Sequence, residues 1–323
     1  MRFASFRFNG QNSYGVALAD NEIVDIRAAA EDCPDELIDL LRMGDAGRAL
    51  AVRILDNPPA EATISIDDIT WYPPIRRPGK ICGIAMNNSA SNERKISAPE
   101  HPAFFLKPAS CLIGHKQAVE IRSYYGSVHP EPELAVVIGS NTRDVNASEA
   151  TQHIFGYTIF DDITGNGMRS EDLFQYYALY ASDDDADKLE RREQHLSYAG
   201  RYKGTDSFGV MGPWLVTRDE IPDPDNLAVT CSVGGEVVAQ DNTRFYNYKV
   251  AEIVSFISQF QTLQPGDVIS CGTAFKPSAD RRSIHHANLQ RVGGPIEISI
   301  EGLGTQENPV IRKQMDIGNW RLN

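Results

Sequence analysis

Short runs of apolar residues, separated by glycine, proline and polar turns, recur along the chain and predict many strands and few helices. The run at residues 134–138 is rich in β-branched residues and ends at Gly139, which is typical of a buried strand. A second run of this kind, residues 156–160, ends in two aspartates. Further strands are expected at residues 80–86, 104–108 and 268–272.

The first 72 residues follow a pattern of their own, in which short alternating runs and turn residues predict a small antiparallel sheet. A short helix is expected near residues 35–43, with Leu37, Leu40 and Leu41 as its apolar side. The strands expected in this segment cover residues 2–8, 14–18 and 22–26. We therefore expect two domains: a small N-terminal α/β module at residues 1–72, which serves packing or supports a dimer, and a larger domain at residues 73–323.

The larger segment predicts mainly strands and one clear helix. Val250, Ile253, Val254 and Ile257 recur at the spacing of one helical face, so an amphipathic helix is expected over residues 247–261. Two consecutive glycines at 234–235 are typical of a hairpin turn. The fold class predicted for the whole chain is α+β, predominantly β.

Composition and charge narrow the classes of function. The 323 residues are 41% hydrophobic and 23% charged, as in ordinary globular proteins. The formal net charge of −13 argues against partnership with nucleic acid or with an anionic membrane surface. The N-terminus has no apolar core of a signal peptide, and no stretch is long and apolar enough to span a membrane. Five cysteines without C-x-x-C spacing fit a reducing compartment, so a cytoplasmic protein is expected.

Candidate chemistry gathers where the two central strands begin and end. Glu131 and Glu133 lie two apart at the start of a strand, so their carboxylates project to the same side. If the strands are neighbours, Asp162 can add a third oxygen ligand. Such a set suits Mg²⁺, with Mn²⁺ or Ca²⁺ as alternatives. The alternative is a solvated strand start and a polar turn, but the glycine-rich segment 164–167 nearby favours the metal site.

Several motifs together resemble the fumarylacetoacetate hydrolase family, in the form of its bacterial members that carry a small N-terminal domain. The residues that carry the resemblance are Lys80-Ile-Cys-Gly, Phe105-Leu-Lys-Pro-Ala-Ser110, Glu131-x-Glu-Leu-Ala-Val-Val-Ile-Gly139, Gly156-Tyr-Thr158, Asp162, Lys203-x-x-Asp206, Gly212-Pro-Trp-Leu215, Asn242-Thr243, Pro265-Gly-Asp-Val-Ile269 and Gly272-Thr273. The resemblance covers residue 80 to the C-terminus and implies a mixed β-roll catalytic domain. It also implies a divalent metal on Glu131, Glu133 and Asp162, a catalytic lysine at Lys203, a substrate-contacting threonine at Thr273, and a homodimer.

This chain departs from the family pattern in the segment that follows residue 86. C–C hydrolases of the family usually carry a histidine and a glutamate on a lid there, and this chain has no histidine at that point. Glu93 and His101 are the nearest candidates for these catalytic roles.

Two more departures concern the segments after the metal aspartate. The family's Ala-Arg-Asp is replaced by Gly165-Asn166-Gly167, so Asn166 and Arg169 are candidate substrate-binding residues, with Arg169 as the carboxylate partner. Residues 176–202 are expected to be an insertion whose acidic run is solvated and whose His195 is a surface residue. A cationic cluster of Arg281, Arg282, His285 and His286 is expected to be exposed, with the minority hypothesis that one member reaches the pocket.

The function expected is a divalent-metal-dependent hydrolase that cleaves a C–C bond in a small anionic diketo or 2-oxo acid, such as an acylpyruvate or a fumarylacetoacetate-like compound, through a metal-stabilised enolate. Such an activity belongs to aromatic catabolism. The alternatives are a decarboxylase, isomerase or dehydratase of a 2-oxo acid on the same metal site, and then a non-catalytic metal-binding protein.

Overall fold

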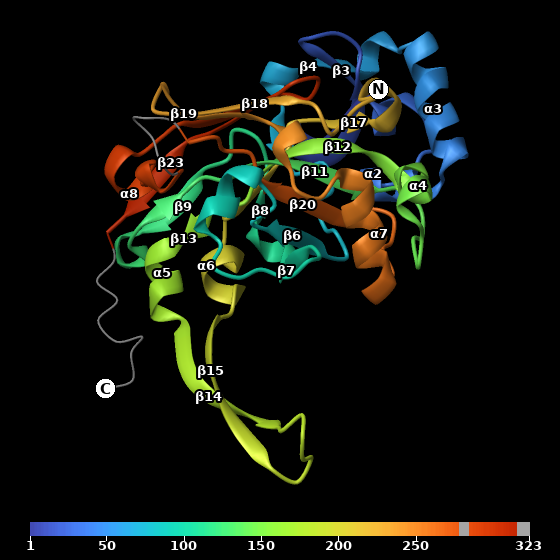
Figure 1. Cartoon of the computed structure of the whole chain (residues 1–323). Helices are drawn as coiled ribbons and strands as arrows, with labels where there is room; N and C mark the ends of the chain where they lie inside the picture. Colours follow the sequence, from blue (N-terminus) through green and yellow to red (C-terminus); the bar gives the residue numbers. More distant parts are fainter. Residues whose placement is uncertain (278–283, 315–323) are drawn as a thin grey trace.

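The structure, a computed structural model, describes residues 1–277 and 284–314 (Figure 1). One mixed sheet of 13 strands runs through these residues, and ten of its strands follow the order β4-β3-β2-β1-β17-β12-β11-β20-β6-β7. Their bounds are β1 (Arg2–Phe8), β2 (Gln11–Ala17), β3 (Glu22–Asp25), β4 (Thr63–Ser65), β6 (Ile81–Ala85), β7 (Ala103–Lys107), β11 (Pro132–Ile138), β12 (Ile154–Asp161), β17 (Leu215–Thr217) and β20 (Val268–Thr273). The other three are β5 (Thr70–Tyr72), β8 (Leu112–Ile113) and β16 (Gly209–Met211). The predicted α+β class, predominantly β, is confirmed.

Strand β11 lies in the middle of this sheet, and every one of its residues is buried. It pairs antiparallel with β12 on one side and with β20 on the other, and β20 pairs parallel with β6. A strand covered on both faces reads as a continuous apolar run, which is why residues 134–138 predicted it.

Smaller sheets pack beside the main one. A four-stranded sheet has the order β19-β18-β21-β22, with β18 (Ala228–Val233), β19 (Glu236–Asn242), β21 (Ile296–Ile300) and β22 (Gly304–Asn308). Gly234 and Gly235 join β18 to β19 with φ of 60° and 81°, a left-handed backbone that glycine adopts without strain, so the predicted hairpin turn is confirmed. Two further pairs are β9 (Val119–Arg122) with β23 (Val310–Lys313), and β10 (Val128–His129) with β13 (Thr164–Gly165).

The helices are short and lie around the sheets (Figure 1). Helix α7 (Val250–Phe260) buries the four apolar residues whose spacing predicted it. Helix α2 (Leu37–Arg42) also lies where a helix was expected, whereas α3 (Asp45–Asp56) was not predicted. The other helices are α1 (Ile26–Ala29), α4 (Ala147–Ala150), α5 (Asn166–Glu171), α6 (Gly200–Gly204) and α8 (Leu289–Val292). Among the residues described, no helix is long and apolar enough to cross a membrane.

The N-terminal segment shares the main sheet with the rest of the chain. Strand β1 pairs with β2 and β5 and also with β17, so the sheet continues across the segment's border. The rings of Trp71 and Trp214 meet edge to face at 5.0 Å at this border. The domain boundary at residue 72 stays a prediction.

A long hairpin leaves the body of the protein between α5 and α6 (Figure 1). It consists of β14 (Leu173–Ala181) and β15 (Leu189–Ser197), which pair with each other in a two-stranded sheet. Its turn holds the acidic run Asp183–Asp185 predicted to be solvated, and these three side chains are exposed. His195 is also exposed, as the sequence led us to expect.

Protonation of His115 in acid is expected to lower the stability of the fold. Its ring is buried against Trp71, at 5.2 Å between centroids, and its Nδ1 accepts a hydrogen bond from the Glu307 amide at 3.0 Å. Burial, aided by the nearby Lys116 charge, lowers the pKa of His115 to about 4.

We expect His115→Asn to flatten the loss of stability in acid. With a folded pKa below the unfolded value of 6.5, the contribution of His115 is complete above pH 6.5 and is lost as pH falls towards 4. This loss amounts to at most ~3 kcal/mol, at ~1.4 kcal/mol per pKa unit. Urea unfolding followed by tryptophan fluorescence at several pH values measures it. A variant whose free energy of unfolding falls as steeply as that of the wild type would contradict the prediction.

Candidate metal centre

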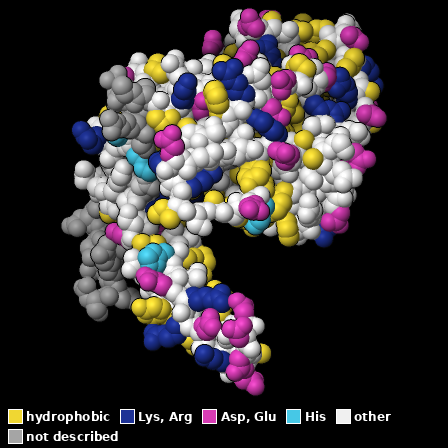
Figure 2. Space-filling model, in the orientation of Figure 1, with side chains coloured by type: hydrophobic (Ala, Val, Ile, Leu, Met, Phe, Trp, Pro, Cys, Tyr) yellow, Lys and Arg dark blue, Asp and Glu magenta, His cyan; other side chains and the backbone are white. Residues whose placement is uncertain are grey.

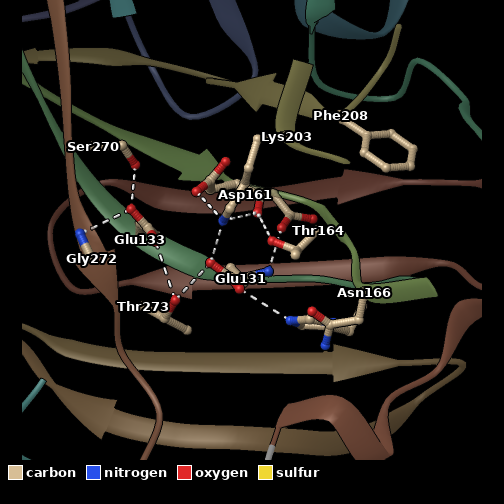
Figure 3. A network of polar contacts seen from close by, with 12 residues as sticks. Glu131, Glu133, Asp161, Thr164, Asn166, Lys203, Phe208, Ser270, Gly272 and Thr273 are labelled. Atoms are coloured by element: carbon tan, nitrogen blue, oxygen red, sulfur yellow. Dashed lines mark hydrogen bonds and ion pairs between the residues drawn. The ribbon is translucent and has the colours of Figure 1, made fainter. Parts of the chain in front are cut away.

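Three carboxylates meet where β11 begins and β12 ends. Figure 3 shows two of them, Glu131 and Glu133, with Lys203 beside them. Glu131 directly precedes β11, Glu133 is its second residue, and Asp162 directly follows β12. The antiparallel register sets Pro132 opposite Asp161, so the start of one strand lies beside the end of the other. One oxygen of each of Glu131, Glu133 and Asp162 lies within 4.8 Å of the other two. The sequence therefore selected side chains that the fold does bring together.

Glu131 is held by three side chains. Its Oε2 accepts hydrogen bonds from Lys203 Nζ at 2.8 Å and from Thr273 Oγ1 at 3.0 Å, and its Oε1 lies 3.0 Å from His129 Nε2. Burial alone would raise the pKa of Glu131, but Lys203 and His129 hold it well below its usual range. This carboxylate is therefore ionised at neutral pH.

Glu133 is fixed from the side of β20. Its Oε2 accepts hydrogen bonds from Ser270 Oγ at 2.5 Å and from the Gly272 amide at 2.9 Å, and its Oε1 accepts one from Thr273 Oγ1 at 3.2 Å. Gly272 has φ of 108°, and a Cβ there would lie 2.7 Å from Asn87 Cβ, so the position requires glycine. The family motif Gly272-Thr273 thus has a local reason: it delivers two donors to this carboxylate.

Two buried lysines flank Asp162. Lys107, the last residue of β7, donates to Asp162 Oδ1 at 2.5 Å and also to the backbone oxygens of Lys203 and Phe208. Lys203, from α6, donates to Asp162 Oδ2 at 2.5 Å. Burial would lower the pKa of Lys203, but the carboxylates of Asp162, Glu131 and Glu133 raise it well above its ordinary value. Sequence reasoning assigned no role to Lys107, although a lysine directly after the apolar run Phe104-Phe-Leu106 was a signal for a buried, paired cation.

A fourth carboxyl group, Asp161, lies under the cluster. Its Oδ1 accepts a hydrogen bond from the Glu131 amide at 2.7 Å, whereas its buried Oδ2 has no hydrogen-bond partner among the described residues. Burial and the nearby Asp162 charge raise the pKa of Asp161 to about 7, against the opposing effect of the hydrogen bond from the Glu131 backbone. Asp161 therefore supports the backbone of Glu131 and adds negative charge behind it.

The charges of the cluster fit a divalent cation. Four carboxyl groups and two lysines leave two negative charges when all are ionised. Without a cation, burial and the crowding by Asp162 and Glu131 raise the pKa of Glu133 to about 8. Protons on carboxyl groups and a bound cation are alternative ways to relieve this repulsion. Glu131, Glu133 and Asp162 thus form a divalent-metal site with hard oxygen ligands.

Glu131, one of the three carboxylates, lines a cleft of about 320 Å³. Glu131, Lys203 and Thr273 line one part of it, and Arg94, Arg169 and His285 line another. The ring of His285 packs against that of His129 at 4.3 Å between centroids. Partial burial and the proximity of His129 lower the pKa of His285 to about 4, so this ring is neutral at pH 7. The cleft combines a metal site, two guanidinium groups and a neutral imidazole.

The remaining candidate residues do not line the cleft. Glu93 is exposed, and His101 stacks on the ring of Phe256 at 5.1 Å; neither is among the described residues that line the cleft. Asn166 is also absent from the described lining of this cleft, and its Nδ2 lies 2.9 Å from His285 Nδ1 and 3.4 Å from His129 Nδ1.

The histidine that does line the cleft is His285, a member of the predicted cationic cluster. Arg281 and Arg282 of that cluster lie outside the described residues. His285 is therefore the member of the cluster to which the minority hypothesis, that one of them reaches the pocket, applies.

Comparisons with known proteins agree with this geometry. Residues 80–311 match the family described as fumarylacetoacetate (FAA) hydrolase C-terminal. A putative hydrolase of Burkholderia multivorans is 31% identical over 302 residues, which cover 92% of this chain and 94% of the relative. A mitochondrial oxaloacetate tautomerase of Bos taurus is 28% identical over 295 residues, or 90% of this chain and 84% of the relative.

A solved structure shares the fold over nearly the whole length. The maleylpyruvate hydrolase from Sphingobium sp. SYK-6, in complex with manganese(II) ion and pyruvate, superposes with a TM-score of 0.71 at 27% identity, covering 97% of this chain and 100% of that chain. The relatives thus include hydrolases and a tautomerase, while the motifs, the fold and the family match agree with one another. This chain belongs to the fumarylacetoacetate hydrolase family.

Proposed function

We propose that this protein is a divalent-metal-dependent hydrolase that cleaves a C–C bond in a small diketo or 2-oxo acid, such as an acylpyruvate. One observation carries the proposal: Glu131 of the three-carboxylate cluster lines a cleft that also presents guanidinium groups and a neutral histidine. The similar maleylpyruvate hydrolase structure, with its manganese ion and pyruvate, supports a 2-oxo acid as the ligand class and Mg²⁺ or Mn²⁺ as the ion.

The walls of the cleft favour an anionic substrate. The carboxylate and 2-oxo oxygens of such a substrate are hard ligands that suit the open face of a three-carboxylate metal site. Arg94 and Arg169 can pair with a second carboxylate at the far end of the molecule, since a guanidinium binds a carboxylate through two parallel hydrogen bonds. Thr273, which lines the cleft, completes the proposed substrate-binding set, and Asn166 belongs to it through its contact with His285.

In this proposal, hydrolysis adds one water molecule across the C–C bond. When bound, the cation supplies Lewis-acid polarisation of the 2-oxo carbonyl. His285 takes a proton from water as its oxygen attacks the remote carbonyl carbon. The bond from that carbon to the methylene group then breaks, and its electron pair moves to the 2-oxo oxygen. The Lys203 ammonium stabilises the negative charge there, and the proton that His285 took from water passes to the methylene carbon as pyruvate forms.

The contact between Asn166 and His285 bears on the proposed role of His285 as the general base. Asn166 Nδ2 lies 2.9 Å from His285 Nδ1 and 3.3 Å from its Nε2, so this amide group orients the imidazole ring beside the cleft. Asn166 would thus act on the substrate through His285 rather than only by direct contact.

A second candidate function is tautomerisation or isomerisation of a 2-oxo acid on the same site, with decarboxylation or dehydration as related outcomes. The observation that favours it is the position of Glu93 and His101, neither of which reaches the cleft as a lid base. Proton transfer between carbon and oxygen needs the metal site but no attacking water. Similarity to an oxaloacetate tautomerase is consistent with this candidate.

The homodimer and the cytoplasmic location that the sequence predicts are also part of this proposal. The five cysteines are free thiols, which is consistent with a reducing compartment.

Purified protein with Mn²⁺ or Mg²⁺ is expected to release pyruvate from at least one acylpyruvate, and EDTA is expected to abolish the release. A coupled assay for pyruvate measures this reaction. With oxaloacetate, loss of the enol form without release of pyruvate or CO₂ would instead support the tautomerase. No metal-dependent turnover of any acylpyruvate would overturn the hydrolase proposal.

Glu133→Gln is expected to weaken Mn²⁺ binding by ~100-fold or more, because loss of even an outer partner of a metal ligand costs 10–100-fold. Isothermal titration of the metal-free protein gives the affinity. Glu149→Gln, an exposed change on α4, is the matched control and should bind Mn²⁺ like the wild type. Equal affinities of the two variants would remove Glu133 from the metal site.

His285→Asn is expected to lower kcat for C–C hydrolysis by ~10²–10⁴-fold, the usual contribution of a general base, with Mn²⁺ affinity unchanged. His286→Asn changes the neighbouring exposed histidine, which does not line the cleft, and serves as the control. Steady-state kinetics on both variants tests the assignment. Full activity of His285→Asn would show that another group activates the water.

A further inference from the structure

His129 contacts the metal centre, although neither the family motifs nor the proposed reaction gives it a role. It is the last residue of β10, and its side chain is fully buried. Buried polar groups nearly always make hydrogen bonds, and both nitrogens of this ring have a polar neighbour. Nε2 lies 3.0 Å from Glu131 Oε1, and Nδ1 lies 3.4 Å from Asn166 Nδ2. One edge of the imidazole therefore faces a metal ligand.

The chemistry of the neighbours fixes the direction of these contacts. An ionised carboxylate can only accept a hydrogen bond, so the proton of the contact with Glu131 lies on His129 Nε2. The amide nitrogen of Asn166 can only donate, which matches an accepting Nδ1. An imidazole that donates at Nε2 and accepts at Nδ1 carries no charge. His129 thus orients Glu131 without cancelling the negative charge that a cation needs.

The two oxygens of Glu131 differ in how they are held. Oε2 accepts hydrogen bonds from Lys203 and Thr273. Within the described part of the chain, Oε1 accepts a hydrogen bond from His129 alone. The terminal torsion of a glutamate side chain has a broad energy minimum and does not fix the plane of the carboxylate by itself. Without the His129 donor, this plane would be held at one oxygen only.

The imidazole is itself held in place from two directions. In the pairing of β10 with β13, His129 lies opposite Thr164, whose Oγ1 donates to the backbone oxygen of Asp162 at 3.1 Å. The backbone of His129 is therefore fixed against the segment that carries the third carboxylate. The ring packs against that of His285, with 4.3 Å between centroids and 32° between planes. These contacts keep Nε2 directed at Glu131.

We propose that His129 is a positioning residue of the metal centre, whose Nε2–H holds the Glu131 carboxylate in the orientation that binds the divalent cation. Outer partners of metal ligands act in this way in other proteins, where they fix the direction of the ligand atom. This role concerns metal binding and is the same for each candidate reaction.

Overall charge does not replace such positioning. Acidic side chains are scattered over the face of the molecule in Figure 2, as expected for a net charge of −13. Exposed carboxylates attract cations only weakly, because water and salt screen their charge. The carboxylates of the metal centre differ from them in being held by hydrogen bonds before a cation arrives, and His129 supplies one of these bonds.

Calorimetric titration of the metal-free, full-length protein with Mn²⁺ tests the proposal. His129→Phe keeps an aromatic ring against His285 but has no donor, so we expect it to bind Mn²⁺ ~10–100-fold more weakly than the wild type. His129→Gln places an amide N–H near the position of Nε2 and should recover most of this loss. A merely structural role would lower the thermal stability of both variants without this difference in affinity.

His153→Phe is the matched control, because His153 contacts Ser140 outside the metal centre, and it should bind Mn²⁺ like the wild type. Circular dichroism checks that each variant is folded. If His129→Phe does not fold, His129→Asn, whose amide is too short to reach Oε1, takes its place in the comparison. Wild-type affinity of the donor-free variant, or a loss in His129→Gln as large as in that variant, would overturn the proposal. Because the titration measures metal binding alone, its outcome is separate from that of the acylpyruvate assay.

Discussion

The mutual repulsion of four carboxyl groups at the junction of β11 and β12 is the constraint around which the structure is arranged. Two of these groups, Glu133 and Asp161, have raised pKa values because burial and like charges disfavour their ionised forms. The compensating groups come from three other elements: Lys107 ends β7, Lys203 lies in α6, and Ser270 with Gly272 belongs to β20. The polar network thus joins strands that lie far apart in sequence, at the centre of the main sheet. A divalent cation completes the balance with hard oxygen ligands.

The charge balance at the metal site is the same for each candidate reaction. The side chains that line the cleft therefore decide between these reactions. Under the proposed function, a cation on the three carboxylates would, together with Lys203, polarise the substrate in the same way whether a C–C bond or a C–H bond is to be broken. What differs is the group that moves a proton, and here the cleft presents His285 rather than a residue of the segment after β6. Family membership therefore fixes the metal chemistry, while the reaction depends on a few side chains around it.

The hairpin shows a different constraint, which concerns backbone rather than charge. Among residues 1–277 and 284–314, each strand of the hairpin pairs only with the other, and only β15 carries a run of charged residues along its edge. The central strands of the main sheet do not face this constraint, because they are paired on both sides. The metal site and the hairpin thus set independent demands on the sequence, one for buried ionisable groups and the other for an uncharged strand.

The sequence alone determined the features that depend on local periodicity. The apolar run of β11, the two-residue spacing of Glu131 and Glu133, the helical spacing in α7 and the turn at Gly234 follow from neighbouring residues, so they were predictable. The motifs also identified Asp162 as the third carboxylate.

Only the tertiary structure decided which groups compensate and surround these carboxylates. Lys107 and Asp162 are 55 positions apart, and His285 approaches Asn166 across 119 positions. The hairpin was not predictable either, because the apolar run of β14 and the charged run 189–197 become strands only by pairing with each other. Local pattern fixes the face on which a side chain lies, but long-range packing chooses its neighbours, and the chemistry of a buried charge depends on those neighbours.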